Sequence, residues 1–129
     1  MRLLLDTHSF LWFIGGSTSL SPTVRSLIED ASNQPFLSVA SLLWEMAIKV
    51  SLGKMSLARP FEVLIPQQMG LNGINLLGIE MEHTAVVSKL PFHHRDPFDR
   101  LLIAQAMVEQ MPIVSVDADF DAYNVERLW

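Results

Sequence analysis

The residues of this chain best placed to do chemistry are carboxylates that interrupt apolar stretches. Asp6 directly follows the apolar residues 3–5, and Asp117 directly follows the apolar residues 112–116. Both stretches have the length and composition of buried strands, and in an α/β sheet the functional sites form beyond the carboxyl ends of the strands. Asp6 and Asp117 are therefore candidate site residues. A loop or helix-capping role for Asp6 is an equally good interpretation of that residue taken alone.

Glu45 is the single carboxylate in the otherwise apolar residues 42–48. Its neighbours at helical spacing are Leu42 and Ile48, so it has no broad polar face to occupy. A half-buried carboxylate is costly unless something neutralises its charge. Lys49 stands four residues later and offers an ordinary helix ion pair. A bound metal ion is the alternative partner, and we favour it.

A helix start is predicted at residues 96–99, with Asp96 as the N-cap and Pro97 at the first helical position. Capping accounts for Asp96 without any catalytic role. It also places Asp99 in the first turn of the helix, where a second role is compatible with the helix start. The N-terminus of a helix exposes N–H groups and the positive end of its dipole, which also suit a nearby phosphate.

The acidic residues near the C-terminus do not form a calcium-binding loop. Such a loop, if it began at Asp117, would need glycine at its sixth position and glutamate at its twelfth, but Ala122 and Leu128 stand there. Asp119 and Asp121 are expected to be caps and solvated loop residues. Asp117 therefore remains a candidate site residue because it stands at the end of the preceding strand.

Other reactive residue types give no site. His93 and His94 lie in a polar segment with no third ligand at zinc-like spacing, so neither is expected to bind metal. The chain has no cysteine, which excludes a thiolate metal site, a disulfide framework and a cysteine nucleophile. The serines lack both a credible histidine base and a nucleophile elbow, which argues against serine hydrolase chemistry.

The charge of the chain agrees with carboxylates that hold a cation. Its formal net charge is −5, whereas proteins that bind nucleic acid by backbone neutralisation alone are basic. An acidic protein that handles phosphates usually borrows positive charge from a metal ion. The apolar run at the N-terminus is too short for a signal peptide or a membrane span, so a soluble, cytoplasmic protein is expected.

Predicted strands alternate with predicted helices, and the sequence has no internal repeat, low-complexity tract or linker. We therefore expect a single domain over residues 1–129, with a parallel sheet covered on both faces in a three-layer α/β/α architecture. Ser21 and Ser41 are predicted to cap helices, and Gly70 is predicted to end one. Strands are expected at residues 2–5, 35–39, 73–78, 112–116 and 125–129. Helices are expected at residues 22–32, 42–50, 60–69, 80–90 and 97–111.

Four segments, in this order, resemble the PIN domain, and specifically the VapC-like toxins of bacterial toxin–antitoxin pairs. Residues 3–8, Leu-Leu-Leu-Asp-Thr-His, are similar to the opening strand of the family with its first acid. Residues 41–45, Ser-Leu-Leu-Trp-Glu, are similar to the helix that carries the second acid. Residues 96–106 begin with Asp-Pro-Phe-Asp-Arg and resemble the third and most specific block. Residues 114–120 are similar to the fourth, so the resemblance spans nearly the whole chain.

The resemblance implies a parallel sheet of about five strands with the four acids of the family gathered at its carboxyl edge. Carried over by position, Asp6, Glu45 and Asp99 match the central acids, and Asp117 matches the more variable fourth. Either acid of the Asp-Pro-Phe-Asp-Arg motif could reach the metal, and Asp99 is ranked first because it keeps the family spacing. These oxygen ligands favour Mg²⁺ or Mn²⁺ over zinc.

The same resemblance extends the site beyond the four acids. Ser115 matches a small hydroxyl residue often found just before the fourth acid, and Thr7 and Asp96 are further candidates for the site. Three residues are candidates for contact with RNA: Arg95, Arg100 and His8. For each of them, a plain surface role is the alternative.

The activity implied by the resemblance is endonucleolytic cleavage of RNA. A cation would polarise the phosphate and activate the attacking water, leaving 5′-phosphate and 3′-hydroxyl ends. The alternative is a catalytically inactive PIN-like module that binds RNA or another protein, and the presence of all four acids argues against it. A receiver-like signalling domain is disfavoured because Asp6 stands alone and no lysine follows Lys89.

The resemblance also implies two kinds of protein partner, a second copy of the chain in a homodimer and a cognate antitoxin. Trp12, Phe13 and Ile14 form an apolar cluster larger than a short loop requires. We predict that this cluster helps to cover one of these contacts. Ordinary burial in the core is the alternative interpretation.

Overall fold

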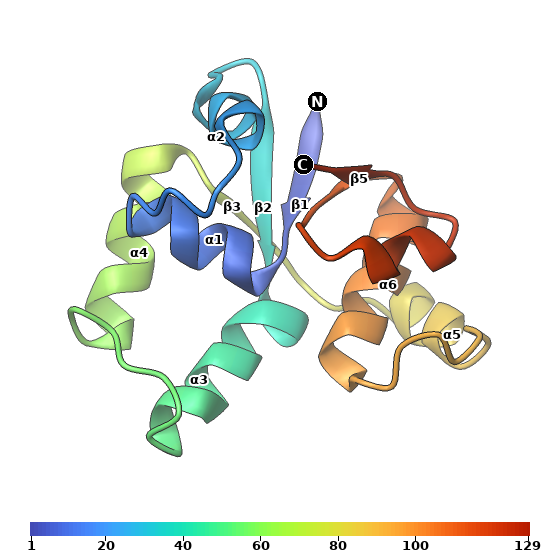
Figure 1. The fold of residues 1–129 in the computed structure, drawn as a ribbon. Coiled ribbons are helices and arrows are strands. Elements are labelled where there is room, and N and C mark those ends of the chain that lie inside the picture. Colours follow the sequence, from blue (N-terminus) through green and yellow to red (C-terminus); the bar gives the residue numbers. More distant parts are fainter.

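A computed structural model describes all residues, 1–129, as three layers built on a five-stranded sheet (Figure 1). All neighbouring strands are parallel, and their order across the sheet is β3-β2-β1-β4-β5. The predicted parallel sheet of about five strands is therefore confirmed. The strands are β1 (Arg2–Leu5), β2 (Gln34–Ser38), β3 (Asn75–Leu77), β4 (Ile113–Val114) and β5 (Arg127–Leu128).

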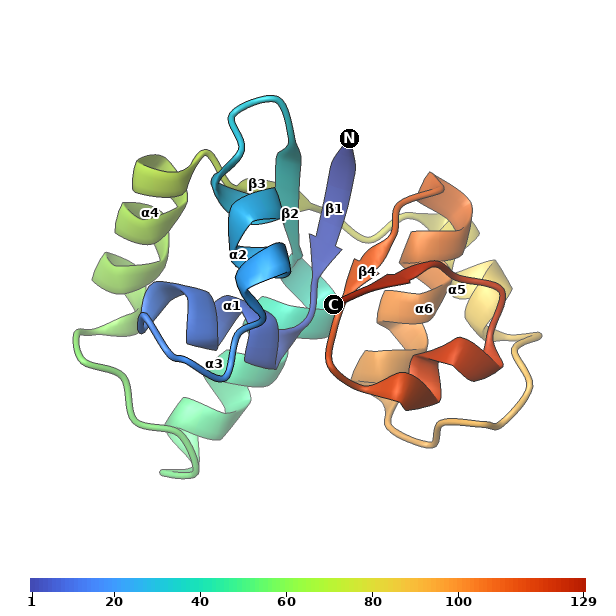
Figure 2. The ribbon, with the colours of Figure 1, turned by 45° about the horizontal axis from the view of Figure 1, so that its top comes forward.

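Six α-helices cover the two faces of the sheet. Figure 2 shows the first four on one side of the strands and the last two on the other. Two further turns are not α-helical: a π-helical turn at Val39–Leu43 and a 3₁₀ turn at Ala118–Ala122. The α-helices are α1 (Thr7–Ile14), α2 (Pro22–Glu29), α3 (Trp44–Ser51), α4 (Phe61–Asn72), α5 (Met81–Val87) and α6 (Pro97–Glu109).

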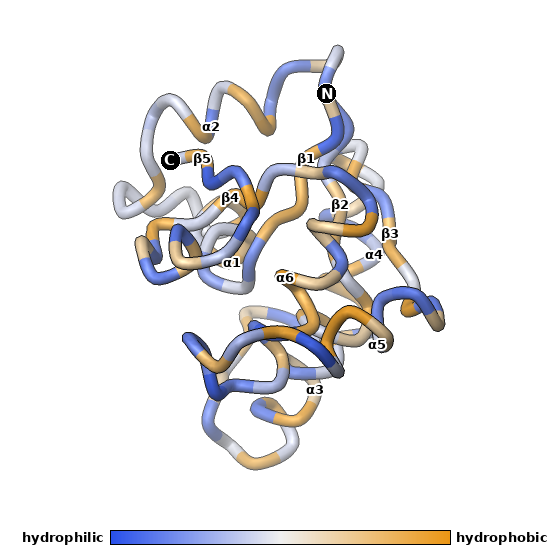
Figure 3. Tube along the Cα trace, turned by 90° about the vertical axis from the view of Figure 1, so that its right-hand side faces the viewer, coloured by the Kyte–Doolittle hydropathy of each residue, from blue (hydrophilic) through white to orange (hydrophobic).

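Strand β1 shows why the sheet needs a helix layer on each side. Leu3 and Leu5 are fully buried in the core beneath α1 to α4, whereas Leu4 is fully buried in the second core beneath α5 and α6. Successive side chains of a strand point to opposite faces, so an uninterrupted apolar strand must be covered twice. Hydrophobic residues accordingly concentrate in the strands and the helices packed on them (Figure 3).

Several helix boundaries differ from the sequence prediction: the helices predicted at 22–32 and 80–90 end earlier, at Glu29 and Val87, and two predicted caps lie elsewhere. Ser38, and not Ser41, provides the cap before α3, since the Ser38 hydroxyl accepts a hydrogen bond from the N–H of Ser41. The π-helical turn that follows moves the cap three residues toward the N-terminus. Gly70 lies inside α4, which ends instead at Gly73, where φ is +61° and glycine carries no steric penalty.

Helix α1 was not among the predicted helices, because its residues 10–14 are all apolar and show no helical alternation with polar residues. Phe13 is buried in the core, and Trp12 and Ile14 are partly buried against it. Trp12 also contacts Trp129 edge-on, with ring centroids 5.9 Å apart. Core packing accounts for this cluster, and its role in a dimer or antitoxin contact stays a prediction. None of the helices combines the length and hydrophobicity that crossing a bilayer requires.

Candidate active site

The carboxyl ends of β1 and β4 and the N-terminal ends of α3 and α6 meet at one cleft with a volume of about 220 Å³. All four predicted acids line this cleft. A larger hollow of about 500 Å³ lies between the ends of α2 and α4, but Glu29 and Asp30 are its only acids. We therefore place the chemistry in the smaller cleft. Its lining is Asp6, Thr7, His8, Glu45, Lys49, Asp96, Asp99, Val116, Asp117 and Phe120.

Asp6 is buried, with 9% of its surface exposed, at the point where β1 ends and α1 begins. One carboxylate oxygen accepts a hydrogen bond from the N–H of Ser9 at 2.9 Å and so caps α1. The Ser9 hydroxyl in turn donates to the carbonyl of Val114 in β4 at 3.0 Å. Asp6 therefore has the capping role that the sequence offered as the alternative, and it also lines the cleft, where its own N–H donates to the carbonyl of Val114 in β4.

Glu45 reaches the cleft from the first turn of α3, and its side chain is only 13% exposed. Thr7 donates its hydroxyl to one Glu45 oxygen at 2.8 Å. Lys49 lies 3.5 Å from the other oxygen, so the ordinary helix ion pair that the sequence offered is formed. Thr7 is thus a residue that positions Glu45. Lys49 brings a positive charge to the cleft wall and remains 43% exposed itself.

The helix start at residues 96–99 is as predicted. Asp96 caps α6 by accepting hydrogen bonds from the N–H groups of Phe98 and Asp99, at 2.8 and 3.0 Å. Pro97 occupies the first helical position. One carboxylate therefore fixes the helix end, and the other, on Asp99, faces the cleft.

The capping role of Asp96 gives a direct prediction. Asp96→Ser should keep both the fold and any nuclease activity, because serine caps helices about as well as aspartate. Asp96→Ala should lose about 0.5–2 kcal/mol of unfolding free energy. Urea denaturation of the two variants and the wild type measures this difference. A stable but inactive Asp96→Ser protein would mean that the carboxylate itself is needed in the site.

Negative charge is concentrated around Asp99. Burial, the largest cause, and the neighbouring charges of Asp96, Glu45 and Asp117 together raise the pKa of Asp99 to about 6, while His94 opposes the shift. A carboxyl group in such surroundings holds its negative charge at a cost that a bound cation would relieve. Together with the oxygen-only donor set of the four acids, this fits a hard divalent cation.

The raised pKa predicts how the stability of the metal-free protein depends on pH. Asp99 loses its proton near its ordinary pKa of 3.8 in the unfolded chain and only near a pKa of about 6 in the folded chain, so folding is favoured at low pH. This contribution is lost as pH rises through about 6. Solvent screening limits it to roughly 1–2 kcal/mol. In EDTA, the free energy of unfolding of Asp99→Asn minus that of wild type should be larger at pH 7 than at pH 4.5. Equal differences at the two pH values would refute the shift in pKa.

Asp117 follows β4 and begins the 3₁₀ turn at Ala118–Ala122. Its N–H donates to the hydroxyl of Ser115 at 3.0 Å, and one carboxylate oxygen accepts from the N–H of Asp119 at 2.9 Å. Ser115 is completely buried and does not line the cleft. Ser115 therefore positions Asp117 from the protein interior.

The structure corrects the RNA-binding role predicted for Arg100. Its side chain lies in the interior, 6% exposed, and does not line the cleft. The guanidinium donates hydrogen bonds of 3.0–3.3 Å to four backbone carbonyls around the loop between α5 and α6. Arg100 thus holds that loop in place. Arg95 is exposed but also lies outside the cleft lining, whereas His8 lines it.

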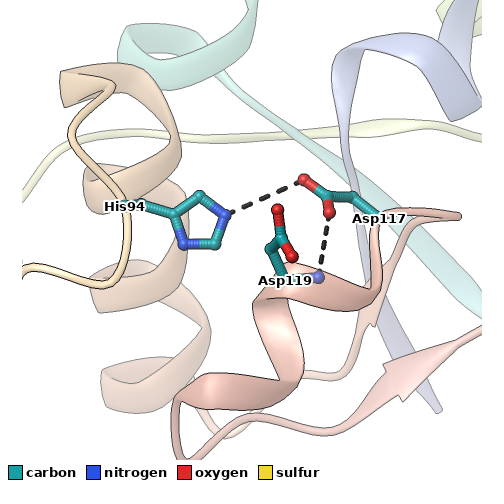
Figure 4. Close-up of side chains that lie close together, drawn as sticks. All are labelled: His94, Asp117 and Asp119. Carbon is teal, nitrogen blue, oxygen red and sulfur yellow. Dashed lines mark hydrogen bonds and ion pairs between the residues drawn. The ribbon is translucent and has the colours of Figure 1, made fainter.

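His94 is the site residue that the sequence did not indicate. Its Nε2 lies 3.8 Å from a carboxylate oxygen of Asp117, and Asp119 lies beside them (Figure 4). Ligand atoms of these three residues all lie within 4.8 Å of one another. The fold thus brings two carboxylates to His94 that the spacing in the sequence did not indicate. No three of the four predicted acids bring ligand atoms within 4.8 Å of one another, although all four line the same cleft.

Comparison with known proteins agrees with the fold and shows the family of the chain. The family model described as the PIN domain matches residues 3–126. Ribonuclease VapC16 of Mycobacterium tuberculosis (strain ATCC 25618 / H37Rv) is 36% identical over 61 residues. The match covers 47% of this chain and 43% of that protein, so it spans less than half of the relative.

Similar solved structures show the same fold at low identity. A chain in the crystal structure of VapBC2 from Rickettsia felis, bound to a DNA fragment from its promoter, has a TM-score of 0.73 and 16% identity. That alignment covers 100% of this chain and 99% of the other. A chain of FitAcB from Neisseria gonorrhoeae has a TM-score of 0.67 and 18% identity, with coverages of 98% and 96%.

Proposed function

The chain belongs to the PIN domain family, and we propose that it is a metal-dependent endoribonuclease of the VapC toxin type. The observation that carries this proposal is the meeting of Asp6, Glu45, Asp99 and Asp117 in one cleft, from four separate elements. Helix capping alone does not explain why four acids converge at the carboxyl edge of a parallel sheet. The partial match to a ribonuclease of the same class supports the assignment.

The four acids would hold Mg²⁺ or Mn²⁺ through carboxylate oxygens. When bound, such a cation supplies positive charge to the scissile phosphate and acidity to a water molecule. It would also reconcile the net charge of −5 with an RNA substrate, since phosphate and protein would otherwise repel each other.

The remaining residues of the cleft orient the acids and receive the RNA. Thr7 fixes the rotamer of Glu45, and Ser115 fixes the backbone of Asp117. The N-terminus of α6 directs the positive end of its dipole toward the cleft, which favours a phosphate there. His8 and Lys49 line the same wall and are the side chains placed to contact the RNA backbone.

Protein partners form part of the same proposal. The structures from Rickettsia felis and Neisseria gonorrhoeae are of VapBC2 and FitAcB, and that from Klebsiella pneumoniae is described as a toxin–antitoxin complex. We propose that this chain likewise binds a cognate antitoxin, forms a homodimer and acts in the cytoplasm. The competing proposal, an inactive RNA-binding or interaction module, is less well supported because every acid of the family pattern is present.

The test is cleavage of a mixed RNA pool by purified protein with millimolar Mg²⁺ or with EDTA. We expect products with 5′-phosphate and 3′-hydroxyl ends in Mg²⁺ and none in EDTA, because water attacks phosphorus and the 3′ oxygen leaves. End labelling distinguishes these ends from 2′,3′-cyclic phosphates, which form when the ribose 2′-hydroxyl attacks. Cleavage that persists in EDTA would overturn the metal dependence of the proposal, and binding of RNA without cleavage would favour the competing proposal.

A further inference from the structure

His94 is a buried imidazole whose polar atoms have no use in the fold. Only 9% of the residue is exposed, and neither ring nitrogen has a hydrogen-bond partner in the protein. The ring stacks on Phe120, with centroids 5.0 Å apart and planes inclined by 20°. Buried polar atoms of folded proteins are nearly always paired, so an unpaired imidazole in a packed position indicates a ligand.

The backbone of His94 is fixed from both sides. Its N–H donates to the phenolic oxygen of Tyr123 at 2.7 Å, and its carbonyl accepts from the guanidinium of Arg100 at 3.3 Å. Tyr123 itself donates to the carbonyl of Pro91 at 2.9 Å. The loop that carries His94 is therefore tied to α6 and to the C-terminal segment. A ligand residue held in this way is preorganised.

Two carboxylates lie where a cation beside His94 needs them. The Asp117 oxygen nearest to Nε2 is 3.8 Å away, too far for a hydrogen bond but a distance that an ion with bonds of about 2.0–2.2 Å can bridge. The other Asp117 oxygen is held by the N–H of Asp119. The exposed Asp119 carboxylate completes a group with all ligand atoms within 4.8 Å, open to solvent on its side (Figure 4).

We propose that His94, Asp117 and Asp119 form a cation position separate from that of the four acids, and that it takes Zn²⁺ or Mn²⁺ in preference to Mg²⁺. The imidazole sets this preference, because nitrogen ligands suit Zn²⁺ whereas Mg²⁺ keeps oxygen ligands and its waters. The position shares Asp117 with the proposed nuclease site. It does not depend on RNA cleavage, since it concerns only cation binding.

Histidine side-chain NMR on the metal-free protein tests this position. Zn²⁺ is added stoichiometrically while the ring nitrogens of the four histidines are followed in long-range ¹H–¹⁵N spectra. His94→Phe, which keeps an aromatic ring on Phe120, identifies the His94 signals. We expect Zn²⁺ to shift the His94 ring and Mg²⁺ to leave it unchanged. Asp119→Asn should weaken the Zn²⁺ response at least roughly 10-fold.

Asp6→Asn separates this position from the nuclease site, because Asp6 belongs to the four acids only. We expect Asp6→Asn to keep the His94 response to Zn²⁺ even if it abolishes RNA cleavage. A His94 ring that ignores stoichiometric Zn²⁺ overturns the proposal, as does an Asp119→Asn protein with unchanged affinity. Loss of the response in folded Asp6→Asn also overturns it, since the ring would then report an ion in the acid cleft. Asp119 is exposed, so its variant remains informative if His94→Phe fails to fold.

Discussion

Asp6→Asn and Asp99→Asn should each lower the rate of RNA cleavage by roughly 10²–10³-fold while the protein stays folded. Each substitution keeps the shape of the side chain but removes one negative charge from the proposed cation site. The cation then binds more weakly, and both the charge on the phosphate and the activation of water are reduced. Initial rates on one RNA at saturating Mg²⁺, with circular dichroism as the check on folding, measure the effect.

Asp30→Asn is the matched control for these two variants. Asp30 is exposed at the end of α2, where it accepts hydrogen bonds from Ser32 and does not line the cleft. The same chemical change there should leave the rate within about twofold of wild type. Near-normal cleavage by a folded Asp6→Asn protein would remove Asp6 from the catalytic site, and with it the assignment of the other acids.

Arg100→Met should be the most destabilising single change considered, at about 3–5 kcal/mol. Methionine fills most of the volume, but four backbone carbonyls lose their donor, and each buried unsatisfied group costs about 1–3 kcal/mol before the loop relaxes. Packing of the guanidinium over Phe92, 4.0 Å from the ring centroid, is lost as well. At roughly 3–6 °C per kcal/mol, the melting temperature should fall by about 9–30 °C.

Arg95→Met provides the comparison, because Arg95 has the same side chain but lies exposed five residues earlier. It should change stability by no more than about 0.5 kcal/mol. Arg100→Lys should recover only part of the loss, since one ammonium group cannot donate along the two arms of a guanidinium. Equal melting temperatures for Arg95→Met and Arg100→Met would show that the carbonyl contacts contribute nothing.

The pattern of strands and helices predicted the sheet and pointed to Asp6 and Asp117, and the resemblance to PIN domains implied that four acids gather at its carboxyl edge. Alternating apolar strands and helices allow only a doubly covered parallel sheet, and Asp6 and Asp117 end two strands that lie side by side in it. Asp96 and Pro97 likewise carry a local signal that tertiary contacts do not override. The apolar strands and the helix cap depend on neighbours in the sequence, so they can be predicted without knowledge of the fold.

Features set by distant contacts could not be predicted in this way. His94 stands among polar residues, a pattern typical of a solvated loop, yet it is buried because Arg100 and Tyr123 draw its backbone inward. Arg100 was a candidate for contact with RNA, but backbone carbonyls around the loop between α5 and α6 accept its hydrogen bonds, and its side chain lies in the interior. The shift of the cap from Ser41 to Ser38 arises from a π-helical turn that no residue pattern signals.

The central claim, that the four acids form a Mg²⁺ site, is tested most directly by thermal melting of wild type and Asp99→Asn at pH 7, in EDTA and in Mg²⁺. A hundredfold excess of Mg²⁺ over its Kd should stabilise the wild type by about 2.7 kcal/mol, or roughly 8–16 °C. Asp99→Asn should melt above wild type in EDTA, because one of the mutually repelling charges is gone, and should gain less from Mg²⁺. A wild-type protein that ignores Mg²⁺, together with an Asp99→Asn protein that melts lower in EDTA, would contradict the claim.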